Sequence, residues 1–105
     1  MSTLHSLATS LIARQPRFLA VLLHLADGVL RNEKFDAVFT QHALDWLRFN
    51  SFIWLIWTDK SVEEWYEIMR HQITPQDQVL IFRIDLKERA GWSQKWVWDW
   101  IDRPR

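Results

Sequence analysis

The chain has 105 residues, of which 49% are apolar, so it fits one folded domain with a single core and excludes global disorder. Its 13 basic and 13 acidic residues cancel to a formal charge of zero, which argues against a protein held on nucleic acid by bulk charge. The absence of cysteine excludes disulfides, thiolate metal sites and cysteine nucleophiles, and we expect a cytoplasmic location.

The first part of the chain predicts an N-terminal element, a strand and a helix. Residues 1–16 have apolar side chains at near-helical spacing and predict a short helix or an arm. The apolar run 18–25 suits a strand buried on both faces or a buried helix, and we favour the strand. Residues 33–42 predict a helix with one apolar face, with Asn32 as its expected N-cap.

The middle of the chain predicts a tight hairpin. Its arms are residues 44–50 and 52–58, joined by the turn-like pair Asn50-Ser51. Aromatic and β-branched residues fill the second arm, which is the strongest strand signal in the sequence. A single helix over 35–49 is the competing interpretation of the first arm.

The clearest helix signal covers residues 61–72. Ser61 and Glu64 have the spacing of a capping box, and an apolar stripe follows them. Residues 78–85 predict a strand that alternates between two faces.

A last helix is predicted over residues 94–101, capped by Ser93, with Trp96 and Trp100 in its apolar stripe. Residues 102–105 should form a loose tail. The longest apolar stretch, 18–30, is shorter than the roughly 20 residues that span a bilayer, so we expect no membrane segment. No signal peptide is expected, because no small-residue cleavage site follows that stretch.

These elements predict an α+β fold with a ferredoxin-like, split-βαβ antiparallel sheet and helices on one face. The predicted helices at both ends of the chain would be appendages. We divide the chain into an N-terminal arm or helix (1–16), a single domain (17–101) and a tail (102–105).

The segment from Trp46 to Ile101 resembles the SinR-like group of small bacterial proteins, which are distant relatives of the dimeric ferredoxin-fold subunit of the CRISPR adaptation complex. The resemblance covers about half of the chain. Its features are the hairpin ending in Ser51, the segments Trp54-Leu55-Ile56, Thr58-Asp59-Lys60-Ser61 and Val79-Leu80-Ile81, the turn from Ile73 to Asp77, and Trp92 ahead of a Trp-containing helix.

The resemblance implies a ferredoxin-like protomer that pairs as a homodimer. In the CRISPR relatives an acidic residue closes the first strand and is linked to metal-dependent nuclease activity. Here His24 stands nearest that place and Asp27 comes too late in the chain. The resemblance therefore implies that this chain lacks the metal-binding acid.

Two groups of residues are candidates for binding. Trp54 and Trp57 fall on opposite faces of one strand and are the candidate dimer interface. A set of cations and tryptophans near the last loop could contact nucleic acid or a protein partner. Its members are Arg83, Lys87, Arg89, Trp92, Lys95 and Trp98.

Structural interpretations compete with these candidates. Asp85 and Glu88 partly cancel the charge of the last loop, which favours an ordinary solvated loop. Trp96 and Trp100 are expected in the core, whereas Trp98 lies off their stripe and is the tryptophan expected to be exposed.

Catalytic and metal chemistry finds little support in the sequence. The histidines have no zinc-site spacing, and His24 is expected to be a satisfied buried residue in a strand. No nucleophile elbow, phosphate-binding loop or dinucleotide motif occurs. We therefore expect no catalytic residues, no metal and no cofactor.

The sequence predicts a non-enzymatic homodimeric interaction module that binds a protein partner through sheet edges and exposed tryptophans. The alternative is a metal-dependent nuclease or nucleic-acid-binding protein of the CRISPR-adaptation type, lacking the catalytic acid.

Overall fold

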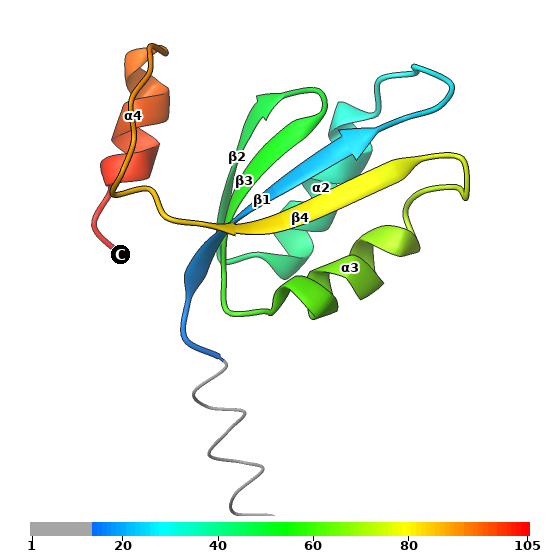
Figure 1. Cartoon of the computed structure of the whole chain (residues 1–105), viewed down its shortest axis with the longest axis horizontal. Coiled ribbons are helices and arrows are strands. Elements are labelled where there is room, and N and C mark those ends of the chain that lie inside the picture. Colours follow the sequence, from blue (N-terminus) through cyan, green and yellow to red (C-terminus); the bar gives the residue numbers. More distant parts are fainter. Residues whose placement is uncertain (1–13) are drawn as a thin grey trace, which may run out of the picture.

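The computed structural model describes residues 14–105 and is built on a four-stranded antiparallel sheet in the order β2-β3-β1-β4 (Figure 1). The strands are β1 (Arg17–His24), β2 (Asp45–Asn50), β3 (Ile53–Thr58) and β4 (Gln78–Ile84). The helices are α2 (Asn32–His42), α3 (Val62–Arg70) and α4 (Lys95–Asp102). The sequence predicts an N-terminal arm or helix over residues 1–16. Residues 1–13 of this range lie outside the described residues.

The chain order confirms the predicted α+β class and antiparallel sheet. Helix α2 connects β1 to β2, and β3 lies between those two strands in the sheet. Helix α3 connects β3 to β4, and β1 lies between them. The alternative helix over residues 35–49 is wrong, because the chain turns extended at Ala43 and then pairs with β3. Residues 14–105 contain no helix with the length and apolar character needed to cross a membrane.

Helices α2 and α3 cover one face of the sheet and enclose the main core. The alternation of β1 turns Leu19, Val21 and Leu23 to this face, where they pack with side chains from both helices. Trp54 and Trp65 are fully buried there. The centre of this face is therefore closed within a single protomer.

Helix α3 begins directly after Ser61, the residue that the sequence predicts as its cap. The Ser61 hydroxyl accepts a hydrogen bond from the Glu64 amide at 3.1 Å, and the Glu64 carboxylate accepts one from the Ser61 amide at 3.4 Å. This is the predicted capping box. Trp65 then donates its indole N–H to the buried Thr58 hydroxyl at 2.9 Å, which ties the helix to the end of β3.

Helix α4 lies on the other face of the sheet and packs over only one part of it (Figure 1). Its Val97 and Trp100 contact Leu47 of β2, and Phe18 and Leu55 complete this smaller cluster. The rest of the second face has no helix over it in the part of the chain that the structure describes.

Two of the predicted helix caps are wrong. Asn32 is the first residue of α2, and neither Arg31 before it nor Gln94 before α4 makes a capping side-chain hydrogen bond. Ser93 lies one residue outside the cap position of α4. Both helices are held by packing of their apolar residues, so their starts do not depend on a capping side chain.

Candidate functional site

The most distinctive surface is the uncovered part of the second sheet face, here called the open face and defined as Ala20, Leu22, Ile53, Leu80 and Phe82. Strand register places Leu22 between Ile53 and Leu80, and Ala20 beside Phe82. Leu80 is 55% exposed and Phe82 is 51% exposed. An apolar sheet face left open to this degree is typical of an interaction surface.

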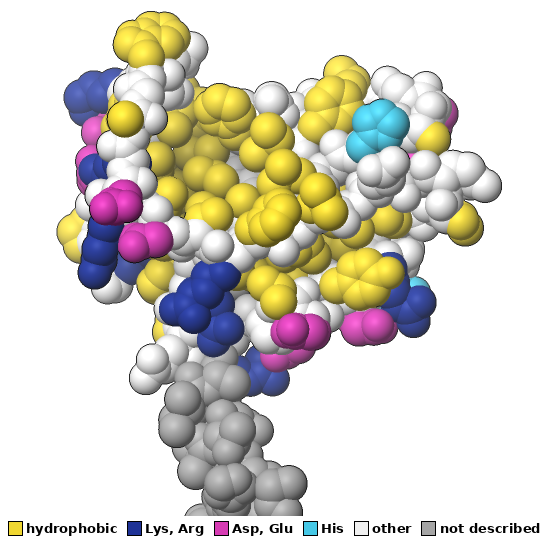
Figure 2. Space-filling view, in the orientation of Figure 1, with side chains coloured by type: hydrophobic (Ala, Val, Ile, Leu, Met, Phe, Trp, Pro, Cys, Tyr) yellow, Lys and Arg dark blue, Asp and Glu magenta, His cyan; other side chains and the backbone are white. Residues whose placement is uncertain are grey.

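The open face is recessed rather than flat. Figure 2 shows apolar side chains gathered in a hollow that the C-terminal helix flanks on one side. Ala20, the smallest side chain of the open face, is buried beside Phe82. Phe49 and Trp96 are also more than half exposed and add apolar surface outside the open face.

The two predicted interface tryptophans lie on opposite faces, in very different surroundings. Trp54 is fully buried beneath α2, contacts Phe35 and Phe39, and donates its indole N–H to Asp36 at 2.9 Å. It therefore offers no surface to a partner of the folded protomer. Trp57 is half-buried on the second face, with its ring 4.7 Å from that of Phe18.

The C-terminal Arg105 is packed into an aromatic cluster, unlike the loose tail that was expected. Its guanidinium lies 4.5 Å from the Trp100 ring, 5.2 Å from Phe18 and 5.7 Å from Trp57. It also pairs with Asp45 at 3.1 Å. Burial lowers the pKa of Arg105, and Asp45 opposes that shift. Sequence reasoning missed this contact, because nothing local in the sequence links Arg105 to Phe18 and Trp57.

The predicted basic residues divide into two groups. Arg83 and Lys87 line a hollow of about 650 Å³ at the end of β4, together with Arg17, Phe18 and Trp57. Asp85 also lines this hollow and accepts a hydrogen bond from the Lys87 amide.

The other two predicted cations are engaged with α4. Arg89 pairs with Asp102 and lies over the Trp98 ring, 5.6 Å from its centre. Lys95 pairs with Asp99 on the same helix at 2.7 Å. Both cations therefore contact α4 and do not line the hollow at the end of β4.

The exposed tryptophans differ from those expected. Trp92 is 91% exposed and Trp96 more than half exposed, whereas Trp98 is half-buried under Arg89. The helical stripe predicted Trp96 in the core. That expectation is wrong because α4 covers only a corner of the sheet, and only Val97 and Trp100 are buried.

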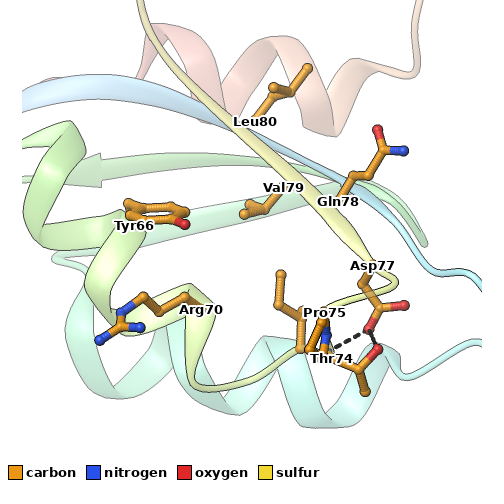
Figure 3. Close-up of a pocket in the computed structure, with 9 residues that line it drawn as sticks. Tyr66, Arg70, Thr74, Pro75, Asp77, Gln78, Val79 and Leu80 are labelled. Carbon is orange, nitrogen blue, oxygen red and sulfur yellow. Dashed lines mark hydrogen bonds between the residues drawn. The ribbon is translucent and has the colours of Figure 1, made fainter.

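A groove runs between α3 and β4. Figure 3 shows Tyr66 and Val79 pointing toward each other from the helix and the strand, while Leu80 projects to the other side of β4. The groove consists of two adjacent hollows of about 450 and 500 Å³ that share Tyr66, Val79 and Leu80. Glu63 and Glu67 also line it.

The aspartates near the other end of the sheet have structural partners. Asp77 accepts hydrogen bonds from the Thr74 and Ala26 amides, and these bonds lower its pKa. The hydrogen bond from Arg31 lowers the pKa of Asp27. His24 is exposed at the end of β1, so its expected burial is wrong. Within residues 14–105, no three metal-ligating side chains gather as a metal site would require.

Comparisons with protein-family models, with curated proteins and with solved structures found no match for this chain.

Proposed function

We propose that this protein is a non-enzymatic interaction module that forms a homodimer in the cytoplasm and binds a protein partner. The open face carries the proposal. In the described protomer, apolar side chains that would form a core in most sheets are left facing solvent. Covering them removes apolar surface from water, at roughly 25 cal/mol for each Å² buried.

A second copy of the chain suits the open face. In a two-fold dimer the same patch lies on both sides of the interface, so a charged patch would meet its own charge. The open face contains no charged residue, and the formal charge of the chain is zero. Self-association therefore meets no like-charge repulsion at the centre of the interface, where Leu80 and Phe82 can act as apolar anchors.

The topology supports a ferredoxin-like protomer as part of the same proposal. Each of the two crossover helices joins strands that are separated by one antiparallel strand, which is the split-βαβ arrangement. Helix α4 would then be an addition after the last strand. A homodimer of such protomers is also what the resemblance to the SinR-like group implies.

Sedimentation equilibrium of the full chain tests the dimer. The substitution Leu80→Glu places a charge in the open face and should weaken self-association at least about tenfold. Leu30→Glu is the matched control, because Leu30 is 56% exposed in the loop between β1 and α2. A wild-type chain that stays monomeric at high micromolar concentration contradicts the proposal, as does a dimer that Leu80→Glu leaves unchanged.

Nucleic-acid binding is the second candidate function, favoured by the hollow that Arg83 and Lys87 share with Arg17 and two aromatic rings. The double substitution Arg83→Ala/Lys87→Ala should weaken RNA or DNA binding and reduce its salt dependence, whereas Arg70→Ala on α3 should not. No cleavage is expected with magnesium or manganese, because the resemblance implies that the catalytic acid is missing. Absence of salt-dependent binding by the wild-type chain removes this candidate.

A further inference from the structure

Within residues 14–105, the outer edge of β4 pairs with no other strand. On its other side, β4 pairs with β1 from Ile84 to Gln78. It spans 7 residues without proline or glycine, and its pairing with β1 is regular. Such an edge presents a row of backbone donors and acceptors to another extended chain.

The groove beside α3 lies along this same edge. Val79 and Ile81 turn toward α3, and Tyr66 stands opposite them with about half of its side chain exposed. A strand added beside β4 would turn every second side chain into this groove and the others toward Leu80 and Phe82. The edge and the groove therefore form one continuous surface for an extended segment.

The groove has a net negative charge, because three carboxylates line it against one cation, Arg70. Glu63 makes no ion pair within residues 14–105, and Glu67 pairs with Arg70 at 3.0 Å. The Asp77 carboxylate is engaged by backbone amides at one end. Lysine or arginine stems can pack along Tyr66 and Val79 while their charged ends reach the glutamates.

We infer that the β4 edge and the α3 groove bind an extended, basic segment of a protein partner by strand addition. This inference rests on the proposed function and names the chemistry of the partner. A second copy fits this edge poorly, because antiparallel pairing of two β4 strands would bring the α3 helices together on one side of the joined sheet. Their glutamates would then face each other, and like charges at an interface reduce affinity.

The test uses the full chain and a synthetic peptide of about eight residues that alternates valine and lysine. Fluorescence anisotropy measures binding, and hydrogen exchange measures protection of the β4 amides. We expect the peptide to bind and to slow exchange in β4, and a valine–glutamate peptide to bind far more weakly. A lysine peptide that is N-methylated on alternate residues cannot complete the ladder and should not bind.

Protein variants locate the charge effect. Glu63→Lys should weaken the lysine peptide roughly fivefold and strengthen the glutamate peptide, since it replaces an attraction by a repulsion. Glu33→Lys is the matched control, because Glu33 occupies the first turn of α2 as Glu63 does that of α3.

Three outcomes would overturn the inference: no binding at millimolar peptide, equal binding of the methylated peptide, or β4 protection that rises with protein concentration alone. The oligomeric state is measured in the same samples. Loss of peptide binding with an intact dimer refutes only this inference, and a monomer that binds the peptide refutes only the dimer.

Discussion

Trp54 and Trp57 lie on the same strand and have opposite surroundings. Trp54 is enclosed by α2 and its N–H is satisfied by Asp36. Trp57 is half covered, by Phe18 and by the guanidinium of Arg105. The difference shows that α2 encloses the centre of one face of the sheet, while the other face is only partly covered by α4 and the C-terminus. In the proposed dimer, the face covered by α2 would stabilise the fold, and the open face would contact the second copy.

Trp54→Ala should have the largest effect. It empties a fully enclosed site and removes the hydrogen bond to Asp36, so the free energy of unfolding should fall by about 3–5 kcal/mol. Urea unfolding followed by circular dichroism measures this loss. A loss below about 1 kcal/mol would mean that the covered face does not hold the fold together.

Trp57→Ala should cost less, about 2 kcal/mol, because solvent already reaches part of the side chain and the site can relax. The same urea titration compares it with Trp54→Ala. If the two losses were equal, the second face would be as important for stability as the first.

The helices on the two faces also differ: α3 begins with a capping box, whereas α4 has no capping side chain. Ser61→Ala removes the capping box of α3 and should cost about 1 kcal/mol. Ser93→Ala, just before α4, makes a matched control and should change stability by less than about 0.5 kcal/mol, since Ser93 does not cap that helix. Thermal unfolding of both variants measures the two losses of stability. A larger loss for Ser93→Ala than for Ser61→Ala would contradict this expectation.

Leu80→Ser should have the smallest effect on the stability of the protomer, within about 0.5 kcal/mol, because more than half of the side chain is already in water. Chemical unfolding at low protein concentration measures the protomer alone. A large loss there would place Leu80 in the core of the protomer and remove it from the open face.

Local patterns predicted the elements well. The capping box at Ser61 and the aromatic and β-branched residues that predicted a strand over 52–58 are local signals, and the structure has the cap and a strand at Ile53–Thr58. The Asn50 turn is equally local, with its side chain accepting a hydrogen bond from the Phe52 amide. Each of these features is decided by neighbours within a few residues.

The predictions that failed concern surroundings that a local pattern does not contain. The stripe of the last helix placed Trp96 and Trp100 on one side, but α4 packs on the sheet through Val97 and Trp100, and Trp96 stays exposed. His24 belongs to an apolar run, yet it is the last residue of β1 and its side chain is exposed to solvent. The open face itself could not be predicted, because Leu80 and Phe82 look like core residues until the helices are placed.

The eight tryptophans differ in their exposure to solvent, so their fluorescence can report which surfaces are covered. Trp54 and Trp65 sit in a dry core and should fluoresce at short wavelength, while Trp92 sits in water, where acrylamide can quench it. Trp57 and Trp96 lie on or beside the second face, between these extremes. Covering that face should shield this intermediate class from the quencher and leave the buried class unchanged, so emission spectra can report assembly without an attached dye.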